Sequence, residues 1–156
     1  MRRLAAAAAR PRRALFRRPL TDRGSGAIVV VFFALVVLGL AAFVVDGGLS
    51  IAQRERAADI AEQAARYAVQ DLDEEALRAG VTPVPVNIGN CANRVAEYAA
   101  SVELTSASVS RSSCTPLAAN RVLVDIEVTY RPVFSGMFYS RPLTVSGTAT
   151  AEARTG

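Results

Sequence analysis

An uninterrupted apolar stretch at residues 27–45, AIVVVFFALVVLGLAAFVV, constrains this chain more than any other feature. Its nineteen residues include no charge, amide or hydroxyl, and fourteen of them are valine, isoleucine, leucine or phenylalanine. At about 1.5 Å per residue, a helix of this length covers roughly 28 Å, close to the ~30 Å hydrocarbon core of a bilayer. The stretch therefore predicts a membrane-spanning helix. The alternative is a buried core helix, but such helices seldom run this far without a polar residue.

The charges on either side of the stretch predict its orientation. Residues 1–23 contain eight arginines and one acid, Asp22, whereas residues 46–156 contain ten arginines and thirteen acids. Because arginines that flank a span favour the cytoplasmic side, we expect the N-terminal arm inside the cell and the remainder outside. The chain thus divides into a basic cytoplasmic arm (1–23), a transmembrane helix with its borders (24–48) and an extracytoplasmic domain (49–156).

A cleaved secretory signal is the main alternative for the N-terminal region, since a basic start followed by an apolar run is its general form. The run is longer than usual for a signal and no A-x-A site follows it, so we expect an intact anchor. A secreted small domain with a cleaved leader remains the alternative. Nucleic-acid binding by the basic arm is not expected, because topology signalling and contact with membrane lipid explain its arginines.

Two cysteines, Cys91 and Cys114, fall in the part of the chain that we expect outside the cell. Thiols there meet an oxidising environment, so we predict a disulfide between them. Closing a loop of about two dozen residues would stabilise the fold by roughly 3 kcal/mol in the chain-entropy model. Two free buried thiols are the alternative.

Helical periodicity continues from residue 49 to about residue 79, where Gly80 is a plausible C-terminal cap. Small or apolar residues recur there in steps of three, four or seven and form one face, opposite a charged side. This predicted interaction face consists of Ile51, Ala58, Ala61, Ala65, Ala68 and Leu72, and Ala57, Ile60, Ala64 and Val69 widen the stripe. An alanine face buries little area per residue but permits close approach, which suits packing against a sheet or against another helix, including a helix-mediated oligomer.

The remaining segments predict an α+β domain. Pro83 and Pro85 favour an extended linker, and residues 91–100 form a candidate short helix. Residues 101–110 are a loosely patterned strand, whereas residues 122–130 and 143–152 alternate clearly between apolar and polar positions. We expect a long N-terminal helix, half in the membrane, with a short helix and a three-stranded antiparallel sheet packed on its outer half.

The segment RPVFSGMFYSRP at residues 131–142, between the last two strands, is a candidate contact loop. Its large apolar residues are Phe134, Met137, Phe138 and Tyr139. They are expected to touch the membrane or a partner, and packing against the sheet is an equally strong alternative.

Catalytic patterns are absent from the sequence. The chain has no histidine, nucleophile elbow, phosphate-binding loop or CxxC motif, and its acidic residues do not match the spacing of a calcium-binding loop. We therefore expect no enzymatic activity, cofactor, metal or small-molecule substrate. A membrane-tethered sensor or adhesion module is a further alternative, but a small domain with few aromatic residues offers little room for a ligand pocket.

Several short motifs together resemble the TadE/TadG-like proteins of bacterial tight-adherence (Flp) pilus assembly. They are DRGS at 22–25, the apolar stretch, VDGG at 45–48, the alanine-rich helix, VTY at 128–130 and LTVS at 143–146. The resemblance covers roughly residues 21–154. It implies a pseudopilin-like protein of the bacterial cytoplasmic membrane that works with other membrane proteins of a pilus-assembly or secretion apparatus and has no catalytic activity of its own.

One position departs from the processed, prepilin-like members of that family. In those proteins a glycine precedes the cleaved bond and a glutamate stands at the fifth position after it. Here Gly24 and Ser25 form the candidate processing border, and Val29 occupies the fifth position. The departure predicts an unprocessed anchor, closer to the TadG kind.

Overall fold

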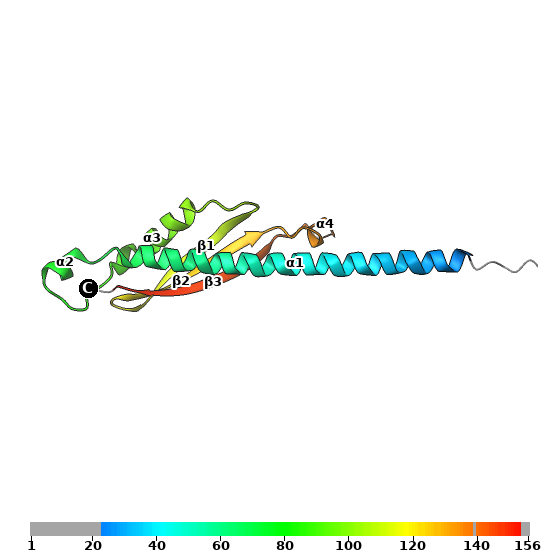
Figure 1. Ribbon diagram of the computed structural model, residues 1–156. Coiled ribbons are helices and arrows are strands. Elements are labelled where there is room, and N and C mark those ends of the chain that lie inside the picture. Colours follow the sequence, from blue (N-terminus) through cyan, green and yellow to red (C-terminus); the bar gives the residue numbers. More distant parts are fainter. Residues whose placement is uncertain (1–22, 139, 154–156) are drawn as a thin grey trace, which may run out of the picture. The chain divides into compact units, whose positions relative to one another are not determined.

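The computed structural model describes residues 23–138 and 140–153, where the chain forms a long helix, three short helices and a three-stranded sheet (Figure 1). The chain divides into two units, Met1–Val37 and Leu38–Gly156. Helix α1 (Arg23–Val69) begins in the first unit and ends in the second. It stays helical through Gly47 and Gly48, so the apolar helix continues into the amphipathic one without a break.

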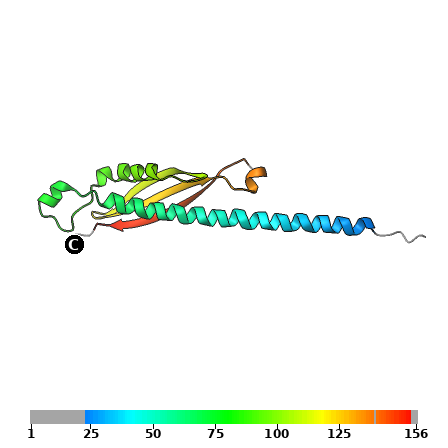
Figure 2. The same ribbon diagram turned by 45° about the horizontal axis from the view of Figure 1, so that its top comes forward.

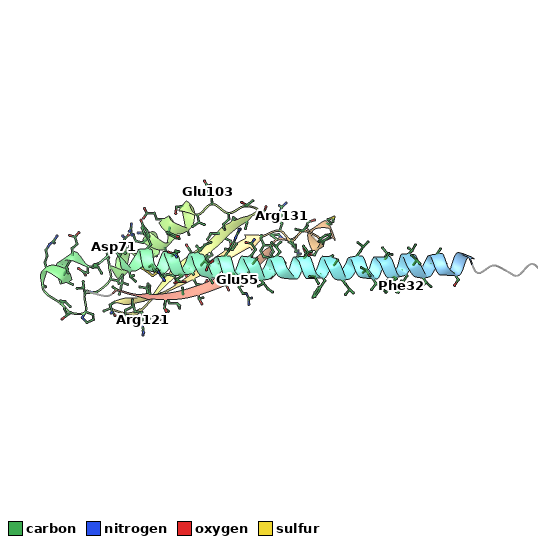
Figure 3. All side chains as sticks on the ribbon, viewed as in Figure 1. Phe32, Glu55, Asp71, Glu103, Arg121 and Arg131 are labelled. Atoms are coloured by element: carbon green, nitrogen blue, oxygen red, sulfur yellow. A yellow bond between two sulfur atoms is a disulfide. The ribbon has the colours of Figure 1, made fainter. Side chains whose placement is uncertain are left out.

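The apolar part of α1 exposes its large side chains, as the side chain of Phe32 illustrates in Figure 3. The exposed fractions of these side chains between Ile28 and Val45 range from 41% at Val36 to 78% at Phe43. Within the described residues, α1 is the one helix long and apolar enough to cross a membrane, with a mean hydropathy of 3.3 over its most apolar window. The sequence prediction of a helix capable of spanning a bilayer is confirmed in length and composition.

Helix α1 ends at Val69, about ten residues before the predicted end. The chain turns after it, and Leu72 forms an isolated antiparallel bridge with Val86. The backbone N–H of Asn87 donates to the carbonyl of Asp71 at 2.8 Å. These pairings to the following linker stop the helix, although the periodicity of the sequence continues past them.

The end of the predicted helix is instead a separate short helix, α2 (Glu74–Arg78). The side chain of Asp73 accepts two backbone N–H groups of its first turn, which makes Asp73 the N-cap. Gly80 has a φ of 74° and follows α2, and the N–H groups of Gly80 and of the next residue donate back to carbonyls of the last turn. Gly80 therefore has the capping role predicted for it, but at the end of α2.

The other elements are α3 (Ile88–Ser101), β1 (Ala107–Ala118), β2 (Arg121–Tyr130), α4 (Ser135–Phe138) and β3 (Leu143–Glu152). The strands form an antiparallel sheet in the order β1-β2-β3. The predictions for β2 and β3 are confirmed. The first strand was predicted at residues 101–110, but β1 begins six residues later and ends eight residues later. The predicted bounds are wrong because α3 continues through Ser101 and the serine-rich segment that follows lacks a strong alternation.

Helices α1 and α3 pack on the same face of the sheet (Figure 2). Alternate residues of β2 supply the centre of the core: Val122, Val124, Ile126, Val128 and Tyr130 are all buried. The opposite face is polar. It carries an ion pair between Arg111 and Glu127 at 3.0 Å and a hydroxyl hydrogen bond between Thr129 and Thr144 at 2.9 Å.

Helix α1 lies close to β3 at Gly147, which is buried and pairs with Ile126 across the sheet. A Cβ atom built on Gly147 would lie closer than 3.0 Å to backbone atoms of Ala57 and Ala58. The side chain of Ala57 is fully buried at this contact. The alanine face and the glycine together bring the helix backbone against the strand, as the alanine-rich pattern suggested.

We predict that Gly147→Ala destabilises the fold. The new methyl group would overlap helix backbone, which cannot rotate away as a flexible side chain can, so the free energy of unfolding should fall by about 2–3 kcal/mol. Urea denaturation of the full chain in detergent, followed by circular dichroism, measures the change.

Gly89→Ala is the matched control. Gly89 lies in α3, and the nearest atom to an added Cβ is Asn87 Oδ1 at 3.7 Å, an ordinary contact. The free energy of unfolding of the Gly89→Ala variant should equal that of the unmodified chain or be slightly higher. Equal stability of the two variants would contradict the close approach of α1 to β3.

Candidate functional site

Half of the six residues predicted for the interaction face are buried inside the folded unit. Ala61, Ala65 and Ala68 are fully buried, whereas Ile51 is 64% exposed, Ala58 is exposed and Leu72 is half-buried beyond the end of the helix. The buried stripe is completed by Gln53, Ala57, Ile60 and Ala64. Most of the alanine face is therefore occupied by the chain's own sheet and by α3.

An aromatic contact joins α1 to α3. The rings of Tyr67 and Tyr98 lie 5.9 Å apart between centroids. The guanidinium of Arg94 lies 3.7 Å from the centroid of Tyr67, a distance at which the cation is attracted to the ring, and it also pairs with Glu97 at 3.2 Å. This cluster fixes the two helices beside each other.

The predicted disulfide is present between Cys91 and Cys114, whose Cα atoms lie 6.1 Å apart. It joins α3 to β1. Cys91 is almost fully buried and belongs to the core, so the bond links the helix to the sheet from inside the fold.

Asp46 makes a contact that the sequence analysis did not anticipate. It is the first residue after the apolar stretch, and its carboxylate accepts three backbone N–H groups from the segment that follows β2. The donors are Val133 at 2.9 Å, Phe134 at 3.0 Å and Ser135 at 2.6 Å. Asp46 thereby caps the start of α4 from a position at least 87 residues away in sequence.

These hydrogen bonds stabilise the charged form of the carboxylate. The backbone N–H groups of Ser135 and Phe134, in that order of importance, lower the pKa of Asp46 from 3.8 to about 2. Asp46 is therefore ionised near neutral pH, and its charge meets the positive end of the first turn of α4.

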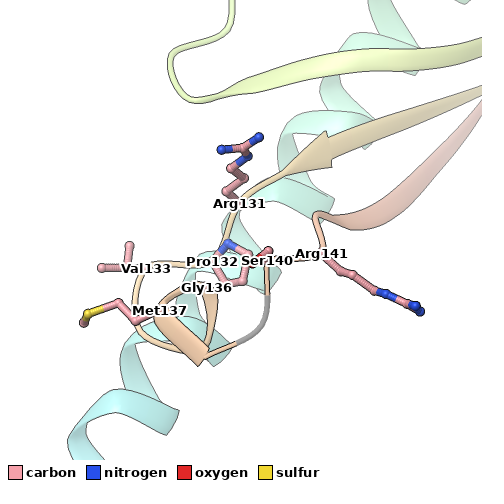
Figure 4. A pocket seen from close by; sticks show the side chains of 7 residues that line it. All are labelled: Arg131, Pro132, Val133, Gly136, Met137, Ser140 and Arg141. Carbon is pink, nitrogen blue, oxygen red and sulfur yellow. The ribbon is translucent and has the colours of Figure 1, made fainter.

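The predicted contact loop begins beside this cap. Met137 is 71% exposed, Val133 56% and Phe134 36%. Phe138 closes α4, but the exposure of its side chain lies outside the described residues, as does Tyr139 altogether. A shallow cavity of about 360 Å³ opens in the loop (Figure 4). Its lining residues are Arg131, Pro132, Val133, Gly136, Met137, Ser140 and Arg141.

A second hollow, of about 670 Å³, lies where α1 meets the end of β2. Gln53 and Tyr130 both line it and are both buried. Neither Gln53 Oε1 nor the Tyr130 hydroxyl has a hydrogen-bond partner among the described residues. The hollow is also lined by Thr105 and Ser106, which carry hydroxyl groups, and by Arg56 and Arg131, and no carboxylate is among its lining residues.

Three acidic residues around α2 have structural partners. Asp71 Oδ2 accepts from Asn90 Nδ2 at 2.6 Å, Asp73 caps α2, and Glu74 pairs with Arg78 at 2.6 Å. In the part of the chain that the structure describes, no group of three or more histidine, cysteine, aspartate or glutamate residues is arranged to hold a metal ion.

The candidate processing border lies in the first turns of α1. Gly24 and Ser25 are helical, and Val29 is 63% exposed. Val29 is the fifth residue after Gly24, so an apolar side chain occupies that position on an exposed helix surface. That the anchor is unprocessed stays a prediction.

Comparison with known proteins gives one match. Residues 24–71 match the family model described as Flp pilus-assembly TadE/G-like. The matched segment contains the apolar stretch, Asp46 and the alanine-rich part of α1, and it ends two residues after the helix does. No curated protein and no solved structure matches the chain.

We predict that the loop after β2 titrates with Asp46. Because the pKa of Asp46 is lowered on folding, the stabilisation from its contacts is present above pH 3.8 and is lost as the pH falls through about 2. The amide chemical shifts of Phe134 and Ser135, measured by NMR on the full chain in detergent, should move with a midpoint near pH 2.

Asp46→Asn should abolish this titration, since the amide carries no charge at any pH. Asp59→Asn, on the exposed side of α1, should leave it intact. Persistence of the midpoint in Asp46→Asn would show that another group holds the loop.

Proposed function

We propose that this chain is a non-enzymatic, membrane-anchored component of Flp pilus assembly or of a related secretion apparatus. The observation that carries the proposal is the coincidence of two findings on one segment. Residues 24–71 match the family model, and the same residues form the exposed apolar helix and its alanine-rich continuation. A helix surface this apolar is stable when lipid or other membrane helices cover it.

In the proposed arrangement the basic arm lies in the cytoplasm and the α+β domain lies outside the cytoplasmic membrane. The excess of arginines before the apolar stretch supports this orientation. The Cys91–Cys114 disulfide also supports it, because structural disulfides persist in the oxidising bacterial periplasm and are rare in the cytosol.

The surfaces left free indicate how such a component would engage its partners. Most of the alanine face of α1 is buried within the chain, so it is not available to another protein without unfolding. The apolar part of α1 and the outer edges of β1 and β3 remain uncovered among the described residues. We infer that other membrane proteins of the apparatus contact the span or these strand edges.

Deletion of the chromosomal copy tests the proposed role. The deletion strain should lose surface Flp pili, as counted by electron microscopy and by the amount of sheared pilin. Expression of the full chain should restore both. A chain with Leu35→Asp and Leu38→Asp should not restore them, because two charges within the apolar stretch oppose insertion.

Gly89→Ala serves as the complementation control, since it lies in α3 and leaves the apolar stretch unchanged. It should restore piliation like the unmodified chain. Normal pili in the deletion strain would refute a role in their assembly.

A further inference from the structure

The described part of the β2–β3 loop (residues 131–138 and 140–142) is held at the end of the apolar stretch. Asp46 directly follows Val45, and its carboxylate binds three consecutive backbone N–H groups of the loop, those of residues 133–135. The loop, Asp46 and residues 38–45 of α1 belong to the same unit of the chain. The position of the loop along α1 is therefore set by the residue at which the apolar surface ends.

Two large apolar side chains of this loop are exposed to solvent. Val133 and Met137 are 56% and 71% exposed, and in Figure 4 their side chains extend from the same side of the loop. Arg131 and Arg141 are also exposed, and they extend in other directions. Met137 lies on α4, and the other three residues flank it in the loop. Apolar side chains with arginines close by in one short segment are typical of segments that lie in a membrane interface.

We propose that the β2–β3 loop rests in the outer leaflet of the membrane that α1 crosses, an inference that depends on the anchoring role proposed above. Val133 and Met137 enter the boundary between headgroups and acyl chains. Arg131 and Arg141 stay at the level of the lipid phosphates. Asp46 is the positioning residue, because it fixes the start of α4 at this height.

Geometry favours lipid over a protein partner as the occupant. The headgroup layer adds roughly 5–7 Å on each side of the hydrocarbon core, and Asp46 stands one residue, or about 1.5 Å, beyond the apolar stretch. Side chains held beside Asp46 therefore lie at headgroup level whenever residues 27–45 span the bilayer. The arginines complement anionic lipid phosphates in charge. The hydrogen bonds to Asp46 also satisfy the carboxylate and the N–H groups of residues 133–135 in this partly dehydrated layer.

The chain contains no tryptophan, so a single introduced tryptophan reports on one position without interference. We would place Met137→Trp in the full chain, reconstituted in vesicles of phosphatidylcholine and phosphatidylglycerol in equal parts, with and without bromine on the upper acyl chains. Bromine quenches tryptophan fluorescence only over short distances. Met137→Trp should lose most of its emission in the brominated vesicles.

Two matched variants calibrate the measurement. Phe43→Trp places the probe within the apolar stretch and should be quenched. Leu117→Trp replaces an apolar residue that is 47% exposed and lies beside the hairpin that joins β1 to β2, at the opposite end of β2 from the loop. It should not be quenched. Adding Asp46→Ala to Met137→Trp should reduce the quenching severalfold, because the loop is then released.

The variants separate failure of this inference from failure of the anchor. Quenching of Phe43→Trp without quenching of Met137→Trp would overturn the loop contact and leave the anchor in place. In that case the loop would be free for a protein partner. Absence of quenching in both would overturn the anchor together with the loop contact. Equal quenching of Met137→Trp and Leu117→Trp would also overturn the loop contact as a specific one, because the whole domain would then lie on the lipid.

Discussion

Gly147 allows the backbone of α1 to lie against β3, since no side chain separates the strand from Ala57 and Ala58. The alanine face of the helix and the glycine of the strand form one contact, and neither tolerates enlargement. Helix α1 and strand β3 pack through close contact of their backbones instead of through large side chains. The core beneath α1 is correspondingly thin, and its largest fully buried side chains are Ile126 and Val95. A disulfide from α3 to β1 adds a covalent restraint where apolar area is scarce.

The same helix satisfies two different environments along its length. Beyond Asp46 one side of α1 is covered by the sheet and by α3, while charged side chains such as Glu62 and Arg66 pair on the other side. Before Asp46 the large side chains are apolar all round the helix, and the described residues leave them exposed. The first kind of surface suits a protein core and the second suits lipid. Asp46 marks the change between them and ties the sheet domain to that point.

Some features could be predicted from the order of apolar and polar residues within a single segment, or from the cysteines. The apolar stretch, the alternation of β2 and β3 and the pairing of two cysteines all follow from composition and spacing. The end of α1 could not be predicted, because a bridge between Leu72 and Val86 interrupts a pattern that remains helical in sequence. The start of β1 was also missed, since pairing with β2 defines that strand and its own serine-rich sequence does not.

The candidate site was the least predictable part of the chain. In the sequence, Asp46 is the first charged residue after the apolar stretch, and nothing in its neighbourhood indicates partners 87 to 89 residues away. Three of the six residues predicted for the interaction face are buried, and the buried stripe also passes through Ala57 and Ala64, which the periodicity placed at its margin. That this face contacts other proteins stays a prediction. Periodicity finds a face of a helix. The partner that covers it decides which residues of that face are used.

Protease treatment of intact spheroplasts tests most directly whether α1 carries the sheet domain across the membrane. The full chain would bear one epitope tag at each end. The account predicts that protease removes the C-terminal tag from intact spheroplasts, while the N-terminal tag stays protected in a membrane-bound fragment until the cells are lysed. Protection of the C-terminal tag, or recovery of both tags in the soluble fraction, would contradict it.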